Sequence, residues 1–193
     1  MQEKGYVIMD AKLLKASYTI DDIYNLPEGE RAELIDGQIY MMAPPNRIHQ
    51  EISGKLYQKI ANYIDSKGGG PCRVYHAAFA VFLNKDDKNY FEPDLSVICD
   101  PSKLTDRGCE GAPDWIIEIV SPSNPAHDYL LKLNKYMAAG VREYWIVDPI
   151  SQAIAVYFFE SDMMPTQYTF TDKIKVNIYD DLYIDFNDID LSI

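Results

Sequence analysis

The amino-acid sequence predicts an α/β protein with a mixed β-sheet core flanked by helices, an N-terminal hairpin and a C-terminal antiparallel meander. Apolar side chains recur at every fourth position within residues 47–66, which predicts an amphipathic helix. Two strand-like runs, residues 114–121 and 143–148, flank a helical stretch at residues 125–140. This order and spacing are typical of one right-handed βαβ unit.

The first expected elements are a short helix and a hairpin. Thr19, followed by two aspartates, has the composition of a helix start, and the helix is expected to stop near Pro27. Residues 31–43 predict a hairpin that turns at Asp36-Gly37, because Asp-Gly is a strong signal for a two-residue turn.

The other expected elements are strands separated by polar loops. Before the βαβ unit, apolar runs predict strands at residues 73–83 and 91–99, with loops at residues 84–89 and 100–113. After it, the meander rich in Tyr and Phe is expected at residues 153–160, 167–171 and 176–184.

Length and composition indicate one domain that does not span a membrane. The 193 residues are expected to form a single domain, 1–193, in which residues 1–16 are a loose leader. No window approaches 18 consecutive apolar residues, and no secretory signal opens the chain. Cys72, Cys99 and Cys109 are odd in number and form no Cys-x-x-Cys pair, which favours reduced thiols and a cytoplasmic protein.

The acidic charge limits the classes of partner. The formal net charge is −12 and the pI is about 4.6, with net −5 in residues 21–36 and −4 in residues 172–193. Non-specific coating of DNA requires Lys and Arg to neutralise phosphates, so this class is disfavoured. The middle of the chain is only mildly acidic and leaves room for a local basic surface.

Three carboxylates stand where the neighbouring residues are apolar. Glu118 lies inside the apolar run 114–121, where an ionised carboxylate is costly unless it is paired or bound to a cation. Asp94 directly follows Pro93, which indicates an edge strand or a strand start and places Asp94 near an end of its strand. Glu33 shares a face of the first hairpin strand with an apolar neighbour.

Two explanations of these acids remain open. Each acid alone could pair with a buried Lys or Arg, or cap a turn. For Asp94 and Glu118, on successive strands, a shared hard cation is favoured, and Mg²⁺ or Mn²⁺ suits a few carboxylates completed by water. The case for Glu33 is weaker, because acidic residues are common before hairpin turns.

The helix after Glu118 offers one lysine placed to reach these acids. Its expected apolar stripe consists of Tyr129, Leu130, Leu133, Tyr136 and Met137. At about 100° per residue, Lys132 flanks this stripe, whereas Lys135 falls on the far face in solvent. The alternative for Lys132 is an ordinary surface ion pair with Asp128, four residues earlier.

Other polar residues are given structural roles. His49, at the start of the long helix, is expected to cap or pack, with a contact to DNA or to a metal site as the alternative. His76 and His127 have no metal-ligand partner at a suitable spacing. The chain has neither a nucleophile elbow around Ser121 nor a glycine-rich phosphate-binding motif.

Several short motifs follow one another in a specific order. They are Glu33-Leu-Ile-Asp-Gly, Ala43-Pro-Pro with His49-Gln50, Glu92-Pro-Asp-Leu-Ser-Val, Glu118-Ile-Val-Ser-Pro, Asp128 with Lys132 and Tyr136, and Ala139-Gly-Val-Arg-Glu-Tyr-Trp-Ile-Val-Asp-Pro149. Together they resemble the PD-(D/E)XK nuclease superfamily and, more closely, its Uma-type restriction-endonuclease-like family. The resemblance covers residues 17–185 and implies a restriction-endonuclease-like core there. The usual lysine position is Val120 here, and the resemblance implies that Lys132 takes its place.

The resemblance implies a Mg²⁺-dependent endonuclease that hydrolyses DNA phosphodiester bonds. Asp94, Glu118 and the backbone carbonyl of Ile119 would hold Mg²⁺ or Mn²⁺, and Glu33 would support the site. Lys132 would orient and help deprotonate the attacking water. DNA is the implied substrate and a homodimer the implied assembly, since cutting both strands needs two sites. The alternative is a non-catalytic interaction module with the same fold, which the net charge of −12 favours.

Overall fold

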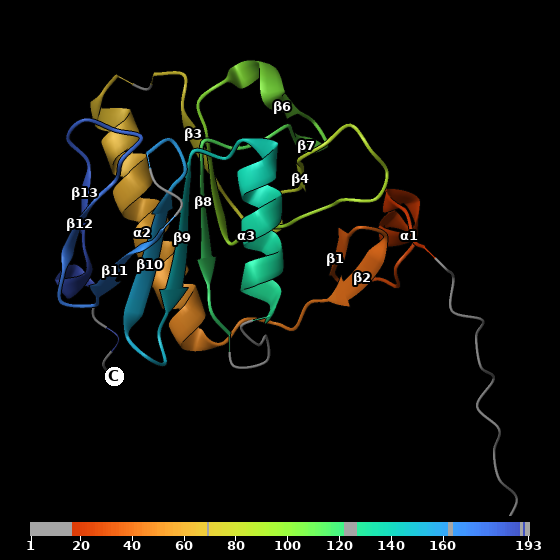
Figure 1. Ribbon diagram of the computed structural model, residues 1–193, viewed down its shortest axis with the longest axis horizontal. Helices are drawn as coiled ribbons and strands as arrows, with labels where there is room; N and C mark the ends of the chain where they lie inside the picture. The colour runs from red at the N-terminus through yellow and green to blue at the C-terminus, as the bar shows by residue number, and fades with distance from the viewer. Residues whose placement is uncertain (1–16, 69, 122–126, 162–163, 190, 192–193) are drawn as a thin grey trace, which may run out of the picture.

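A six-stranded mixed sheet forms the centre of the computed structural model, which describes residues 17–68, 70–121, 127–161, 164–189 and 191. The strand order is β11-β10-β9-β8-β5-β3 (Figure 1). In chain order these strands are β3 (Arg73–His76), β5 (Leu95–Ile98), β8 (Trp115–Ile119), β9 (Glu143–Asp148), β10 (Ala153–Phe158) and β11 (Thr166–Thr169). The expected leader at residues 1–16 lies outside the described residues.

The expected βαβ unit is confirmed in the middle of this sheet. Helix α3 (His127–Ala139) follows β8, and β9 then pairs with β8 in parallel, whereas the other neighbours in the sheet pair antiparallel. Because side chains alternate along a strand, Trp115 and Trp145 point to one face of the sheet, and Ile116 and Tyr144 to the other.

Two helices cover the two faces of the sheet, α3 in front and α2 behind in Figure 1. Helix α2 (Arg47–Ser66) has the predicted bounds and buries Ile52, Leu56 and Ile60 in the core cluster that contains both tryptophans. Helix α3 contributes Tyr136 to the cluster on the opposite face. The expected apolar stripe of α3 is wrong at Leu130, whose side chain is exposed.

The N-terminal hairpin is confirmed, and it is a separate two-stranded sheet. It joins β1 (Ala32–Ile35) to β2 (Gln38–Met41) through Asp36 and Gly37, which have φ angles of 51° and 77°. Positive φ at both central residues is the signature of a type I′ turn. The expected helix before it is α1 (Ile20–Tyr24), and Thr19 donates its backbone N–H to Asp22 there.

Three predictions for the segment between α2 and β8 were wrong. The run 73–83 is two strands, β3 and β4 (Val81–Phe82), and only the end of the run 91–99 belongs to β5. The expected loop 100–113 contains η1 (Pro101–Lys103), β6 (Leu104–Thr105) and β7 (Gly108–Glu110). Strands β4, β7 and β6 form a small sheet of their own, because the Cys109 N–H bonds to Ala80 and draws β7 beside β4.

The end of the expected meander was also wrong. Residues 176–184 do not form one strand, since β12 (Lys173–Lys175) and β13 (Tyr183–Asp185) form a hairpin around them. The inward-facing side chains of this hairpin, Ile174 and Ile184, are buried in the cluster that includes α2. The 3₁₀ helix η2 (Phe186–Asp188) follows, and Phe186 packs there as well.

The expectation of three reduced thiols was wrong for two of them. Cys72 and Cys99 form a disulfide, because they face each other just beyond the paired residues Arg73 and Ile98 of strands β3 and β5. Cys109 is free and buried. In the part of the chain that the structure describes, no helix combines the length and apolar character needed to cross a bilayer.

Candidate active site

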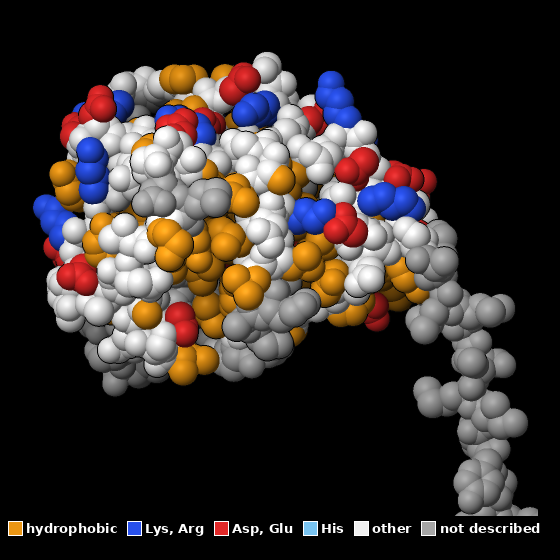
Figure 2. Space-filling view, in the orientation of Figure 1, with side chains coloured by type: hydrophobic (Ala, Val, Ile, Leu, Met, Phe, Trp, Pro, Cys, Tyr) orange, Lys and Arg blue, Asp and Glu red, His pale blue; other side chains and the backbone are white. Residues whose placement is uncertain are grey.

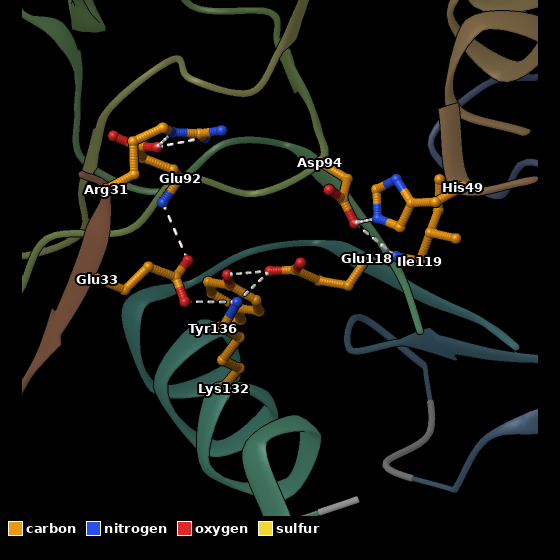
Figure 3. Close-up of polar contacts among 9 residues, drawn as sticks. All are labelled: Arg31, Glu33, His49, Glu92, Asp94, Glu118, Ile119, Lys132 and Tyr136. Atoms are coloured by element: carbon orange, nitrogen blue, oxygen red, sulfur yellow. Dashed lines mark hydrogen bonds and ion pairs between the residues drawn. The ribbon is translucent and has the colours of Figure 1, made fainter. Parts of the chain in front are cut away.

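A pocket of about 720 Å³ lies between the hairpin, the start of α2, and the ends of β3, β5, β8 and α3. Its walls include Glu33, Asp94, Glu118, Ile119 and Lys132, which are the five residues singled out in the sequence. These side chains come from β1, β8, α3 and the residue immediately before β5, and Figure 3 shows them gathered at one place. Their convergence is a structural fact, whereas their chemical roles stay predictions.

Lys132 lies at the centre of the site and is almost fully buried. Its ammonium nitrogen is 2.7 Å from Glu33 Oε2 and 3.1 Å from Glu118 Oε1. The side chain of Asp128, its alternative partner, lies outside the described residues. Lys135, expected in solvent, instead pairs with Asp36 at the exposed hairpin turn. The helical geometry therefore selected the lysine that reaches the buried acids.

Glu118 is a buried carboxylate held from α3. Its Oε1 atom accepts hydrogen bonds from Tyr136 Oη at 2.7 Å and from Lys132 Nζ at 3.1 Å. Burial raises the pKa of the Glu118 carboxyl, the charge of Lys132 opposes this shift, and the charges of Asp94 and Glu33 add to it. Because its pKa is raised, the Glu118 carboxyl keeps its proton to a higher pH than a free glutamate does.

Asp94 is fixed through one oxygen, Oδ2. This atom accepts the backbone N–H of Ile119 at 2.7 Å and lies 3.1 Å from His49 Nε2 (Figure 3). The residue immediately before β5 is thus tied both to the strand that carries Glu118 and to α2. Because two elements hold its carboxylate, the orientation of Asp94 is set before any ligand arrives.

His49 is part of the site, although its position in the sequence predicted a capping or packing role. The Asn46 side chain caps α2 by accepting the His49 N–H at 2.9 Å, and the His49 ring is buried against Asp94. Burial lowers the pKa of this imidazole, but the hydrogen bond to Asp94 and the charges of Asp94 and Glu118 outweigh it, so the net pKa is raised. The helix start indicated by Asn46 was the available signal.

Arg31 and Glu92 also belong to the site and were missed. Arg31 Nε donates to Glu92 Oε2 at 2.8 Å, and Tyr90 Oη donates to Glu92 Oε1 at 2.6 Å. The backbone N–H of Glu92 donates to Glu33 Oε1 at 3.0 Å. The available signal was that Arg31 is the single basic residue of the acidic segment 21–36.

The donor set suits a hard divalent cation. One oxygen of each acid, Asp94 Oδ1 and Glu118 Oε2, accepts no hydrogen bond from the described residues, and both residues line the pocket. The described residues contain no group of three or more His, Cys, Asp or Glu side chains placed to hold a metal. Mg²⁺ is commonly held by only one or two carboxylates, with water and substrate phosphates completing its shell. Asp94 and Glu118 match that requirement, and the carbonyl of Ile119 stays a predicted ligand.

The chain is similar to one protein family and to a solved structure. Residues 20–185 match the model of the Uma2 family, described as "Putative restriction endonuclease". The uncharacterized protein slr1290 of Synechocystis sp. is 29% identical over 150 residues, which are 76% of this chain and 77% of that protein. A crystal structure from Anabaena variabilis, titled as a putative nuclease belonging to DUF820, has a TM-score of 0.71 and 21% identity, covering 89% of this chain and 96% of that one. The family resemblance and the fold class predicted from the sequence are confirmed.

Proposed function

This chain belongs to the Uma2 family, and from that premise we propose that it is a Mg²⁺- or Mn²⁺-dependent endonuclease that hydrolyses DNA phosphodiester bonds. The observation that carries the proposal is the position of Lys132 between Glu33 and Glu118, in the pocket that also contains Asp94. A nuclease of this kind needs carboxylates for a metal and a cationic group beside the phosphate, and both are present in one cavity.

Asp94 and Glu118 are the proposed metal ligands, with the backbone carbonyl of Ile119. When bound, the metal would supply charge neutralisation and a bound water of lowered pKa. His49 and the Ile119 N–H hold Oδ2 of Asp94, which leaves Oδ1 available to a ligand. Lys132 and Tyr136 hold Oε1 of Glu118 in the same way and leave Oε2 available.

Lys132 is proposed to orient the attacking water and, through its positive charge, to lower the pKa of that water, so that its proton passes more readily to bulk solvent. Its ammonium is fixed by two carboxylates, so little conformational freedom is lost when substrate binds. A positive charge beside the phosphate also stabilises the negative charge that develops during hydrolysis. Glu33 is proposed to position Lys132, since its Oε2 atom is the nearer of the two carboxylate contacts.

Plasmid nicking tests the proposal. In Mg²⁺ or Mn²⁺, we expect the wild-type protein to relax supercoiled plasmid and Asp94→Asn to be at least about a hundredfold slower. Asp106→Asn is the matched control, because Asp106 is an exposed aspartate that does not line the pocket. Equal rates for wild type and Asp94→Asn would remove Asp94 from the mechanism.

We propose a homodimer in the cytoplasm as the working form. A cut in both DNA strands needs two sites, and two copies of this chain would supply two pockets that contain Asp94, Glu118 and Lys132. In a reducing compartment Cys72 and Cys99 would face each other as thiols across the same pair of strands. Analytical ultracentrifugation with and without a DNA duplex tests the dimer, and a monomer under both conditions contradicts it.

The second candidate function is a non-catalytic interaction module. The net charge of −12 favours it, because an acidic surface repels DNA and suits a protein partner. Calorimetric titration with Mn²⁺ separates the two candidates. Binding that is lost in Glu118→Gln supports the enzyme, and absence of binding by the wild-type protein supports the module.

A further inference from the structure

Arg31, on the pocket wall, and its buried partner Glu92 form a second charged pair, apart from the proposed metal ligands and Lys132. We propose that Arg31 binds a nucleic-acid phosphate next to the one that is cut, and that Glu92 is a positioning residue that aims its guanidinium. This inference rests on the proposed function, because it assumes a substrate with successive phosphates. Nothing in the family resemblance assigns a role to either residue.

The guanidinium of Arg31 is held in a fixed place. Glu92 accepts its Nε–H and an N–H of its Nη2 atom through one oxygen, Oε2, and Tyr90 holds the other oxygen of Glu92 at 2.6 Å. Glu92 and Tyr90 are themselves buried. The buried side chains of Glu92 and Tyr90 therefore hold the Arg31 guanidinium in one orientation, which reduces the entropy lost when a ligand binds.

The same guanidinium keeps donors for a ligand. Arginine carries five N–H donors, and Glu92 occupies one edge of the fork. The remaining edge, with Nη1, has no hydrogen-bond partner among the described residues, and the side chain is 38% exposed on the pocket wall. A free guanidinium edge is suited to two phosphate oxygens at once, which is the commonest way in which arginine binds phosphate.

The position of Arg31 relative to the acids points to a neighbouring phosphate rather than the one cut. Arg31 precedes Glu33 by two residues, so both side chains leave the hairpin on the same side, about 6.6 Å apart along the strand. In Figure 3, the Arg31–Glu92 pair lies on the β1 side of the Lys132–Glu118 contact, and Asp94 with His49 lies on the other side. A phosphodiester chain held at Asp94 and Glu118 and continuing toward the hairpin would reach Arg31 with its next phosphate.

The alternative role for Arg31 is an ion pair that only fastens the hairpin to the segment before β5. The two roles differ in what salt does to substrate binding. A phosphate contact releases counterions, so its removal lowers the slope of log affinity against log salt concentration by about one unit. A structural pair changes stability without changing that slope.

The experiment measures binding of a dye-labelled DNA oligonucleotide by fluorescence anisotropy, in Ca²⁺, across a series of salt concentrations. The variant is Arg31→Met, and the matched control is Arg47→Met. Arg47 is 43% exposed, against 38% for Arg31, and also pairs with a glutamate, Glu51, but it does not line the pocket. We expect Arg31→Met to bind about tenfold more weakly, with a slope smaller by about one unit, and Arg47→Met to match the wild type.

Two further variants distinguish loss of the phosphate contact from a folding defect and test the positioning role of Glu92. Arg31→Lys keeps the charge, so we expect it to keep the salt slope while it loses affinity, because lysine cannot present a planar fork. Glu92→Gln keeps Arg31 but weakens the hydrogen bonds that orient its guanidinium. We therefore expect a lower affinity for DNA with the salt slope of the wild type. In plasmid nicking, Arg31→Lys should raise KM more than it lowers kcat.

The outcomes separate this inference from the proposed function. If the wild-type protein binds and cuts DNA while Arg31→Met and Arg31→Lys keep its affinity and slope, the phosphate site is wrong and the nuclease stands. An equal loss in Arg47→Met also overturns the site, since the effect would then be one of general charge. If the wild-type protein neither binds nor cuts DNA, both proposals fall together.

Discussion

Lys132 Nζ lies 2.7 Å from Glu33 Oε2, and this contact joins helix α3 to the N-terminal hairpin across the pocket. Both side chains are almost completely buried, with 6% and 3% of their surface exposed. The pair is therefore a link between two parts of the fold as well as part of the proposed chemistry. Because Glu118 shares the same ammonium, removal of the lysine leaves two buried carboxylates without this counter-ion.

Replacement of Lys132 by Met tests this link. We expect Lys132→Met to lower the free energy of unfolding by about 3–5 kcal/mol, because it leaves buried charge uncompensated. Lys135→Met is the matched control on the same helix. Its partner, Asp36, is 62% exposed, so we expect a change within about 1 kcal/mol. Urea titration followed by tryptophan fluorescence measures both, and equal stability of the two variants would show that the buried pair does not form in solution.

The hydroxyl of Tyr136 is a second buried support of Glu118. Tyr136→Phe removes the 2.7 Å hydrogen bond to Glu118 Oε1 without changing the shape of the side chain. We expect a loss of about 1–2 kcal/mol in the free energy of unfolding, measured by urea titration. Tyr40→Phe serves as the control, since the Tyr40 hydroxyl donates an exposed hydrogen bond to Gln38 and to no other described residue. A Tyr136→Phe protein as stable as Tyr40→Phe would contradict the buried bond.

Glu143 gives a pH dependence of stability away from the candidate site. Burial raises the pKa of its carboxyl above the usual 4.5, and hydrogen bonds from Trp145, Ile178 and Asn177 oppose this shift only in part. The folded protein thus keeps this proton to a higher pH than the unfolded chain does. The contribution of Glu143 to the free energy of unfolding is therefore greatest at low pH and falls as the pH rises from the unfolded to the folded pKa.

Glu143→Gln removes this titration and places an amide against hydrogen-bond donors. We expect the variant to be less stable by about 1–3 kcal/mol, since buried donors lose their acceptor. The deficit relative to the wild type should narrow as the pH is raised through the raised pKa of Glu143, because this titration is present only in the wild type. Urea titrations at several pH values measure the deficit, with the exposed Glu160→Gln as control. A deficit that widens with pH would refute the raised pKa.

Two glycines give opposite expectations for the same substitution. At Gly108, φ is +142° and an added Cβ would lie 2.2 Å from the carbonyl oxygen of Ala80, so we expect Gly108→Ala to destabilise the protein by more than about 1 kcal/mol. At Gly54, inside α2, an added Cβ meets nothing within 4 Å. We expect Gly54→Ala to stabilise the helix by about 0.5–1 kcal/mol. Thermal melting of the two variants checks the signs, and a stabilised Gly108→Ala would contradict the close approach of β7 to Ala80.

The elements that could be predicted are those whose signal is local. The bounds of α2 follow from apolar residues four apart between Asn46 and Gly68, and the hairpin follows from Asp36-Gly37. The place of Lys132 follows from helical rotation alone, since its angle from Leu133 decides whether it faces the sheet. In each case the deciding residues lie within one or two turns of each other.

The missed features depend on partners distant in the sequence. Arg31 and Glu92 are 61 residues apart, and His49 and Asp94 are 45 apart, so nothing near any one of them reveals its partner. The disulfide was missed for the same reason, because Cys72 and Cys99 meet only when β3 pairs with β5. The division of residues 73–83 into two strands likewise depends on β7, which pairs with β4 although β5 and β6 lie between them in the sequence.

The attachment of the hairpin has a consequence for folding fidelity. Leu34 exchanges two backbone hydrogen bonds of 2.8 Å with Tyr90, and this pairing, together with the Gly37 N–H bonded to the Lys88 carbonyl, sets the register of β1 against residues 88–90. A slip by one residue would turn Glu33 away and present a leucine to the ammonium of Lys132. The buried ammonium of Lys132 therefore disfavours the shifted register, because a shifted hairpin would leave it without Glu33, the nearer of its two counter-ions. The contact between Lys132 and Glu33 thus favours both the native register of the hairpin and an intact pocket.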